Sequence, residues 1–239
     1  MNLFAPIAPP IDVRLTVLPD VPCPYLPGET ETLRAVMASG VDGETYRAFM
    51  DAGFRRSGKM LYQPVCRSCR ACVPLRVPVG TFSPGASQRR CWRRNADLRV
   101  TTDRPRLSDE KFTLYSRYVH DWHAKPEEAN REALQGFLYD SPTDTIEFEY
   151  RDPAGRLLGV GICDRSRQSL SSVYFYFDPR EARRGLGTFG ALVELDYCRR
   201  LAIDYYYLGY FVEGCGAMNY KATFRPHELL DISGTWVRA

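Results

Sequence analysis

The sequence predicts an α+β fold that is built on a mixed, mostly antiparallel sheet. Residues 173–177 (VYFYF) are aromatic and β-branched, as is typical of a strand. Apolar side chains then recur every three or four residues from Leu186 to Leu201, which is the period of an amphipathic helix. Residues 204–211 follow with three consecutive tyrosines and are expected to form a second strand. A strand, a helix and a returning strand therefore form the expected centre of the fold.

Composition places the chain among globular proteins. With 239 residues, 44% of them hydrophobic, it can bury a sizeable core. No run approaches the roughly 18 apolar residues that a membrane span needs, and residues 1–18 lack a basic start followed by an apolar block. We expect a cytoplasmic, monomeric protein without a membrane contact. The eight cysteines then indicate reduced thiols or metal ligands rather than disulfides.

The beginning of the chain predicts short elements separated by turns. Residues 1–22 are punctuated by prolines and are expected to be irregular or extended, and residues 23–28 form a turn. Asp42 is a typical N-cap for a helix over residues 43–52, which ends at Gly53.

A basic region with three cysteines follows. Residues 54–59 are expected to form a loop, and strands over residues 60–65 and 73–79 are expected to pair as a hairpin with the cysteines in its turn. A basic helix starts at residues 83–87 and continues to Arg94.

The second half contains the larger expected domain. We place a boundary near residue 97, between a smaller cysteine-containing basic domain (1–96) and a larger domain (97–239). Helices are expected over residues 108–123 and 127–140. Three strands are expected to form an antiparallel meander: 145–150, 157–163 and 171–177.

Positive charge is concentrated in one part of the chain. Residues 55–106 hold thirteen Lys and Arg against two acids, although the net charge of the whole chain is +3. Arginine binds phosphate bidentately and stacks on bases, so this density favours a polyanion such as RNA over a merely solvated basic face. The candidates for contacts with RNA phosphate lie on one broad face of the basic helix: Arg89, Arg90, Arg93 and Arg94.

A second candidate for phosphate binding lies between the strand at 173–177 and the helix that follows it. A glycine-containing turn lets backbone N–H groups approach an anion at a helix N-terminus. The alternative is that the glycines only allow close packing of helix and strand. The residues concerned are Arg183, Arg184, Gly185 and Gly187.

The spaced cysteines are the candidate metal ligands. Cys66, Cys69 and Cys72 occur at every third position, so a turn can bring their thiolates to one side, where Zn or an Fe-S cluster takes a fourth ligand. Cys23 or Cys91 can supply that ligand. The alternative is a set of free, partly buried thiols, and we expect no cofactor to be required.

The strand-turn-helix-strand order resembles the core of GNAT acyltransferases. Those enzymes carry Gln or Arg three residues before the first turn glycine, where this chain has Ala182, so a coenzyme A site does not follow from the resemblance. The resemblance implies a GNAT-like domain over residues 97–239, after the smaller cysteine-containing domain.

Several motifs together are similar to the arginyl/leucyl-tRNA-protein transferase family, over essentially the whole chain. They are Tyr25–Gly28, Phe54–Lys59, Tyr62–Val65, Cys66–Cys72, Ser87–Arg90, Tyr174–Pro179 and Gly209–Pro226. The compact length and the cysteine spacing resemble the bacterial branch. This resemblance implies transfer of leucine from leucyl-tRNA to the α-amine of proteins that begin with Asp or Glu, which marks them as N-degrons for proteolysis.

The cysteine pattern departs from that of eukaryotic members of the family. They have Cys-x-x-Cys where this chain has Cys23-Pro-Tyr-Leu26, and a vicinal pair where this chain has three spaced thiols. A cluster in those relatives therefore does not carry over, and here it would need Cys23 with the three later cysteines.

The implied reaction needs little acid-base machinery, since an aminoacyl ester is already activated and the amine needs only deprotonation and placement. An acidic acceptor needs a cation, for which the candidates are Arg55, Arg56, Lys59 and Arg225. We propose Glu213 as proton acceptor or amine-orienting group, and Tyr220 or Lys221 as donors to the terminal ribose or the oxyanion, beside Tyr210.

Three alternatives stay open at the level of sequence. One is arginyl transfer to the same acceptors, and another is an acyl-CoA-dependent GNAT enzyme. The third is a non-catalytic RNA-binding protein with a metal knuckle. The segment at residues 205–226 is rich in Tyr, Gly and Lys beyond what a binding platform requires, which favours an enzyme.

Overall fold

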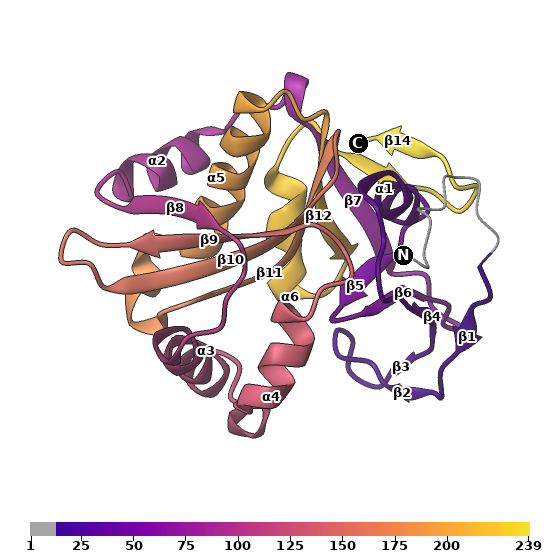
Figure 1. Cartoon of the computed structure of the whole chain (residues 1–239). Coiled ribbons are helices and arrows are strands. Elements are labelled where there is room, and N and C mark those ends of the chain that lie inside the picture. The colour runs from indigo at the N-terminus through magenta and orange to yellow at the C-terminus, as the bar shows by residue number, and fades with distance from the viewer. Residues whose placement is uncertain (1–12) are drawn as a thin grey trace, which may run out of the picture.

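A computed structural model of the chain describes residues 13–239, so most of the stretch 1–22 lies outside the described residues. An eight-stranded sheet crosses the molecule (Figure 1). Only its central pair is parallel, which confirms the predicted mixed, mostly antiparallel sheet. In order along the sheet, the strands are β14 (Trp236–Arg238), β13 (Glu228–Leu230), β7 (Cys72–Pro78), β12 (Tyr205–Val212), β11 (Ser169–Phe177), β10 (Leu157–Arg165), β9 (Thr145–Arg151) and β8 (Arg99–Asp103).

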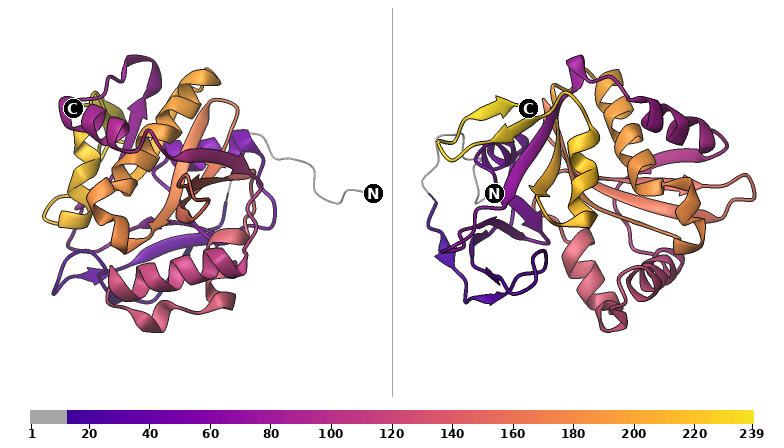
Figure 2. Two further views of the ribbon diagram at one scale, coloured as in Figure 1. Left: turned by 90° about the vertical axis from the view of Figure 1, so that its left-hand side faces the viewer. Right: turned by 180° about the vertical axis from the view of Figure 1, so that it is seen from behind.

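Helices cover both faces of this sheet (Figures 1 and 2). On one side lie α2 (Ala86–Arg94) and α5 (Leu186–Arg200); on the other lie α3 (Asp109–Asp121) and α4 (Arg131–Leu134), which continues into η3 (Gln135–Tyr139). Helices were expected over all of these segments, that of α5 from its periodicity, but the one expected over residues 127–140 is interrupted: a separate short helix covers residues 126–128 and α4 begins only at Arg131. Leu186, Phe189 and Val193 of α5 are buried as expected, whereas Leu201 lies beyond the helix end and is 55% exposed. Shorter helical segments are η1 (Val79–Thr81), η2 (Pro126–Glu128), η4 (Pro179–Arg184), α6 (Gly216–Asn219) and η5 (Tyr220–Thr223).

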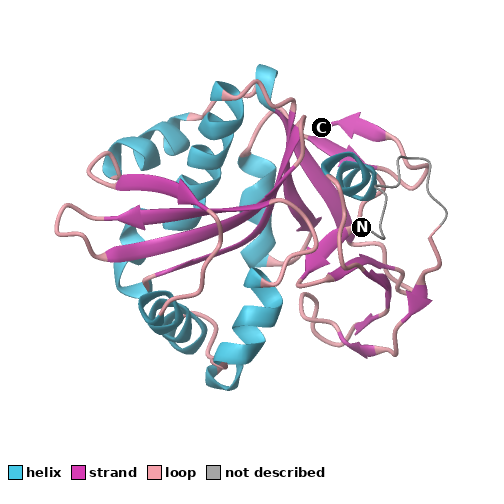
Figure 3. Cartoon of the chain, in the orientation of Figure 1, coloured by secondary structure: helices cyan, strands magenta, loops and turns pink. Residues whose placement is uncertain are grey.

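A smaller unit packs beside β7 and β12 (Figure 3). It contains a four-stranded sheet in the order β1 (Thr16–Val17), β4 (Leu33–Met37), β6 (Met60–Pro64) and β5 (Arg55–Ser57). Helix α1 (Gly43–Asp51) begins at the predicted N-cap Asp42, and a short pair joins β2 (Val21–Pro22) to β3 (Thr30–Glu31). Tyr207 of β12 belongs to the same apolar cluster as Tyr46 and Met50 of α1. The small unit is therefore anchored directly on the large sheet.

The predicted boundary near residue 97 stays a prediction, and the sheet crosses it. Strand β7 pairs with β12 and β13, and its Leu75 and Val77 belong to the larger apolar core. Cys91 of α2 lies in that core too.

Two local predictions are wrong. The strands at residues 60–65 and 73–79 exist, but β6 pairs with β4 and β5 whereas β7 pairs in the large sheet, so they form no hairpin. Residues 54–59 are not a loop, because Arg55–Ser57 form β5. The turn after β5 requires glycine: a Cβ on Gly58 would lie 2.2 Å from the carbonyl oxygen of Gly136.

Candidate functional site

The two parallel strands at the centre of the large sheet pair over only part of their length. The ladder between β11 and β12 ends at Ser171 and Tyr207, although the strands continue to Phe177 and Val212. Beside this point, Gly209 has a φ of +90° and lies at a shift in the register with β7, so β12 bends there. The strands therefore separate and leave backbone groups open between them.

Two cationic side chains enter this opening from different units. Arg55 of β5 donates from Nη1 to Ser171 Oγ at 2.8 Å and from Nη2 to the carbonyl oxygen of Ser172. Lys221 of η5 donates from Nζ to the carbonyl oxygen of Tyr210 at 2.8 Å. A Cβ on Gly209 would lie 3.3 Å from Lys221 Nζ and 3.4 Å from Arg55 Nη2. We call Arg55 and Lys221 the cation pair.

The cation pair is buried without a countercharge. The two residues are 9% and 8% exposed, and neither forms an ion pair with a carboxylate within the described residues 13–239. Burial, and then the neighbouring charge of Arg55, lower the pKa of Lys221 to about 7. Buried cations are costly unless an anion compensates them, so this arrangement is suited to a negatively charged ligand.

Tyrosines line the side of the opening that faces the small unit. Tyr210 donates its hydroxyl to the carbonyl oxygen of Gly53 at 2.9 Å, and its ring centroid lies 6.4 Å from that of Tyr62. Burial raises the pKa values of Tyr25, Tyr62 and Tyr210, while the charge of Arg55 acts on all three in the opposite direction. A bound anion would therefore meet Arg55 and Lys221 in a poorly hydrated setting, where charge-assisted hydrogen bonds are strong.

The predicted catalytic residues are only partly brought together. Tyr210 and Lys221 lie at the opening, and Tyr220 precedes Lys221 in η5 with 38% of its surface exposed. Glu213 is exposed beyond the end of β12 and has no hydrogen-bond or ion-pair partner among the described residues.

Of the four predicted acceptor-binding cations, only Arg55 lies at the opening. Lys59 is exposed in the turn between β5 and β6, and Arg225 is exposed after η5. Arg56 is fully engaged elsewhere, because its guanidinium bonds Asp164 at 2.6 and 3.0 Å and the carbonyl oxygen of Gly58 at 3.1 Å. The prediction that Arg56 binds the acceptor is therefore wrong. Alternating side chains of one strand point to opposite sides, which separates Arg55 from its neighbour.

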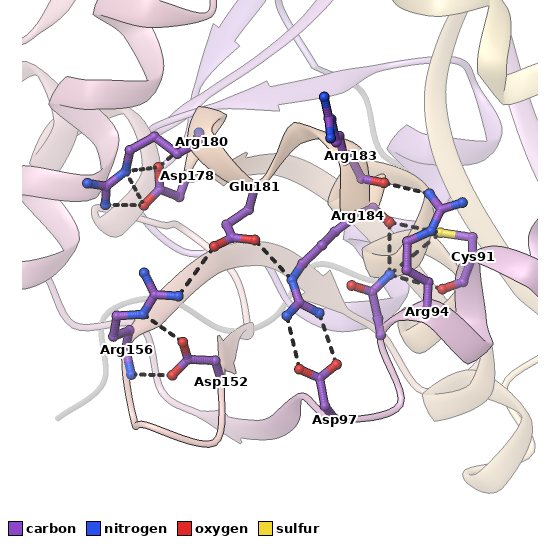
Figure 4. A network of polar contacts seen from close by, with 11 residues as sticks. Cys91, Arg94, Asp97, Asp152, Arg156, Asp178, Arg180, Glu181, Arg183 and Arg184 are labelled. Carbon is purple, nitrogen blue, oxygen red and sulfur yellow. Dashed lines mark hydrogen bonds and ion pairs between the residues drawn. The ribbon is translucent and has the colours of Figure 1, made fainter.

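The glycine turn before α5 has one paired and one exposed arginine (Figure 4). Gly185 has a φ of +68° at the N-cap of α5. Arg184 bonds both oxygens of Asp97 at 2.9 and 3.0 Å and also Glu181 at 3.1 Å, so its guanidinium is already paired with carboxylates, and its contact with phosphate stays a prediction. Arg183 is exposed. A Cβ on Gly187 would meet nothing within 4 Å, so close packing does not explain that glycine.

Helix α2 covers part of this turn. Cys91 Sγ donates to the carbonyl oxygens of Arg184 and Gly185 at 3.6 and 3.4 Å, and Arg94 donates to that of Arg183 at 2.5 Å (Figure 4). The carbonyl groups of the turn thus face protein donors.

The predicted tRNA-binding arginines form an exposed basic surface. Within the described part of the chain, none of them has a carboxylate ion-pair partner, and α2 itself contains no acid. We call this set the α2 arginines: Arg89, Arg90, Arg93 and Arg94. Their contact with tRNA stays a prediction.

The four candidate metal-binding cysteines lie near one another. Burial, and then the neighbouring thiols of Cys23, Cys66 and Cys69, raise the pKa of Cys72 to about 12. Even so, in the part of the chain that the structure describes, no three His, Cys, Asp or Glu side chains are grouped so that they could hold a metal ion. The residues as placed therefore do not fit a metal or cluster. Cys91 is excluded as a fourth ligand, since it contacts the turn before α5.

Sequence reasoning missed Tyr25, Tyr62 and Gly209 as parts of the site, although all three lie in the motifs that carried the family resemblance. Their spacing alone gives no sign that they converge.

Comparisons with known proteins define the class of protein. The N-terminal and C-terminal family models of arginine-tRNA-protein transferase match residues 21–90 and 110–231. The chain belongs to this family of aminoacyltransferases.

The similar proteins are bacterial and named aspartate/glutamate leucyltransferase. That of Pseudomonas putida (strain W619) is 42% identical over 90% of this chain and 92% of its own length. That of Saccharophagus degradans is 35% identical over 95% of this chain and 97% of its own length.

Solved structures show the fold. The C-terminal domain of an Agrobacterium fabrum protein described as a lysylphosphatidylglycerol synthetase matches with a TM-score of 0.52 at 13% identity, over 85% of this chain and 65% of that one. The fold is GNAT-like, as predicted. Within residues 13–239, no helix combines the length and the apolar character that crossing a membrane requires.

Proposed function

We propose that this chain transfers leucine from leucyl-tRNA to the α-amine of proteins that begin with Asp or Glu, and so marks them for proteolysis. We also propose that it acts as a monomer in the cytoplasm. The names of its relatives support the donor and the acceptors. The observation that carries the proposal is the buried cation pair without a countercharge, at the point where β11 and β12 separate.

The chemistry asks mainly for placement of two substrates. The ester of an aminoacyl-tRNA is activated, and an α-amine with a pKa of about 7.7–8.0 is partly deprotonated at neutral pH. Holding the amine against the ester can therefore supply most of the rate. Two separating strands in an acyltransferase fold offer open backbone groups for the reacting carbonyl, as an oxyanion site needs.

The cation pair binds the side-chain carboxylate of the acceptor in this proposal. Arg55 comes from the small unit and Lys221 from η5, so the carboxylate joins the two units when it binds. It also compensates one of the two positive charges, which otherwise repel each other. An amide in place of the carboxylate would leave both cations uncompensated, which is why Asp and Glu are selected over Asn and Gln.

Two residues at the edge of the opening can donate hydrogen bonds to the reacting ester or accept a proton from the amine. Tyr220 is partly exposed beside Lys221 and can donate to the terminal ribose or the developing oxyanion. Glu213 stays a candidate for orienting or deprotonating the amine, from an exposed position beyond β12. An acyl-CoA donor is less suited to this chain, because α2 covers part of the turn where pyrophosphate would sit.

Transfer assays test the function directly. Labelled leucine or arginine on its tRNA is offered with peptides that begin with Asp, Glu, Asn, Lys or Ala. We expect leucine on Asp and Glu peptides only. Transfer of arginine instead would identify arginyl-tRNA as the donor. Transfer from acetyl-CoA, or no transfer at all, would reject the proposal.

Variants of the cation pair test the acceptor site. Arg55→Ala and Lys221→Met should each lower the ratio of kcat/KM for Asp against Asn peptides by roughly 10- to 150-fold, the value of one charge-assisted hydrogen bond. Lys59→Ala and Arg225→Ala are matched controls, because they remove exposed cations. Unchanged Asp/Asn ratios in both cation-pair variants would show that the acceptor carboxylate binds elsewhere.

A further inference from the structure

A pocket lies between α2 and α5, away from the opening between β11 and β12. Its volume is about 320 Å³, within the range of small-ligand sites. Its floor is apolar, and the charged lining residues are arginines with one exception, Asp196. The lining consists of Phe82, Pro84, Gln88, Arg89, Trp92, Arg93, Leu192, Leu195, Asp196 and Arg199.

Trp92 makes one wall of this pocket. It is 41% exposed, and its ring packs against that of Phe189 at a centroid distance of 5.5 Å. The ring is therefore held in place by the core while part of its surface remains open. A fixed and open aromatic ring is a stacking surface for another flat group.

The charges around the pocket favour an anionic partner. Arg89 and Arg93 have no carboxylate partner among the described residues, and Arg199 donates to the carbonyl oxygen of Phe82 at 3.0 Å. The one acid, Asp196, is already paired with Arg200 at 3.1 Å. An apolar floor with arginines around it matches a nucleotide, whose base is flat and whose phosphate is negative.

The pocket adjoins the segment that carries Lys221. Gln88 of α2 donates from Nε2 to the carbonyl oxygen of Thr223 at 3.3 Å, and the rings of Phe82 and Phe224 stack with centroids 6.0 Å apart. Both contacts join the pocket to η5 and the residue after it. An RNA strand whose terminal ribose lies beside Tyr220 of η5 would therefore end next to the pocket.

We infer that this pocket binds an unpaired base from the 3′ end of the RNA donor, stacked on Trp92, with the adjoining phosphate on Arg89 and Arg93. The inference rests on the proposed function, because it takes aminoacyl-tRNA as the donor. Single-stranded RNA is recognised by stacking on aromatic side chains and arginine, whereas paired RNA offers no free base face. Trp92 thus holds the end of the tRNA, and the other α2 arginines contact phosphates further along it.

The test compares intact tRNA with tRNA that lacks its unpaired 3′ end. Trp92→Leu keeps an apolar side chain but removes the stacking surface, and it should weaken binding of intact tRNA by roughly 5- to 150-fold. Trp92→Phe should retain most of the affinity. For the truncated tRNA, wild type and Trp92→Leu should bind equally, because the base that stacks is missing. The slope of log K against log salt should be unchanged in Trp92→Leu, since no charge is lost.

The outcomes separate this inference from the proposed function. The proposed stacking site is wrong if Trp92→Leu binds intact tRNA as tightly as wild type does. It is also wrong if the variant loses affinity for truncated tRNA by the same factor as for intact tRNA. If it instead raises only the KM of the acceptor peptide, the pocket belongs to the protein substrate and the inference also fails. Failure of wild type to transfer leucine, together with the expected binding pattern, would reject the function and leave the RNA site standing.

Discussion

The buried ion pair between Arg56 and Asp164 should be structural, and its loss should destabilise the fold without changing acceptor choice. Both side chains are fully buried, at 0% exposure. Asp164 also accepts hydrogen bonds from the hydroxyls of Tyr46 at 2.6 Å and Thr145 at 2.7 Å. It thereby ties β5 and α1 of the small unit to β10 of the large sheet.

The expected magnitude follows from what each variant leaves behind. Arg56→Met leaves a buried carboxylate with two hydroxyl donors and no cation, and breaking such a pair costs about 3–5 kcal/mol. For a chain of this length, 1 kcal/mol corresponds to about 2–4 °C, so the melting temperature should fall by roughly 6–20 °C. Adding Asp164→Asn removes the uncompensated charge, and the double variant should recover much of the loss.

Urea unfolding at pH 7, followed by circular dichroism and tryptophan fluorescence, measures these free energies. Lys59→Ala is the control, since it removes an exposed cation from the adjacent turn. The reasoning is refuted if Arg56→Met unfolds within about 1 kcal/mol of wild type, well below the range for a broken buried pair. It is also refuted if the folded variant loses preference for Asp over Asn peptides, because Arg56 would then contact the acceptor.

Three further predictions concern the substrates. Replacing all four α2 arginines by Ala should flatten the dependence of log K for tRNA on log salt by about one unit for each phosphate that is no longer neutralised, and an unchanged slope would place tRNA elsewhere. Glu213→Gln should lower kcat/KM near neutral pH by up to about 10²- to 10⁴-fold and recover towards pH 9 if Glu213 is the base; a parallel profile excludes it. At about pH 8, binding of an Asp peptide should be accompanied by uptake of more protons than binding of an Asn peptide. The reason is that the carboxylate of Asp raises the pKa of Lys221 from about 7, so that Lys221 becomes protonated in the complex. Calorimetry in buffers of different ionisation enthalpy measures this uptake, and Lys221→Met should abolish the difference between the peptides.

Most elements of the large sheet could be predicted, because their signals are local. The periodicity of α5, the N-cap of α1 and the meander of β9, β10 and β11 are each visible within a few residues of sequence. Strands β13 and β14 were missed because they are only three residues long each.

The pairing of β7 could not be predicted for a different reason. Two neighbouring strands with a turn between them favour a hairpin, and nothing local indicates that β7 instead inserts between β12 and β13. Its partners lie far along the chain, at Tyr205–Val212 and Glu228–Leu230. Long-range register depends on the packing of the whole core, to which Leu75 and Val77 contribute.

The same limit applies to the candidate site. Lys221 and Tyr210 were identified because they follow a recognisable strand, but the four candidate acceptor-binding cations could not be ranked by residue type alone. Strand alternation in β5 decides between two of them, since it directs Arg55 to the opening and Arg56 to Asp164. Because residues 54–59 gave the signal of a loop, this alternation could not be inferred from the sequence.

The position of Arg55 also explains why a small N-terminal unit accompanies the acyltransferase fold. The large sheet supplies the separated strands and Lys221, yet one buried ammonium group beside a carbonyl oxygen distinguishes poorly between a carboxylate and an amide. Strand β5 adds a guanidinium that is held by Ser171 and Ser172 of β11, at the last residues before the strands separate. Any shift of the small unit against β11 would therefore move Arg55 relative to Lys221. Arg55 is held against such a shift by its own bonds to Ser171 and Ser172, while the buried bond of Arg56 to Asp164, from the adjacent position in β5, stabilises the packing of the two units. In the proposed function, the first of these two successive arginines therefore binds the acceptor, whereas the second stabilises the fold.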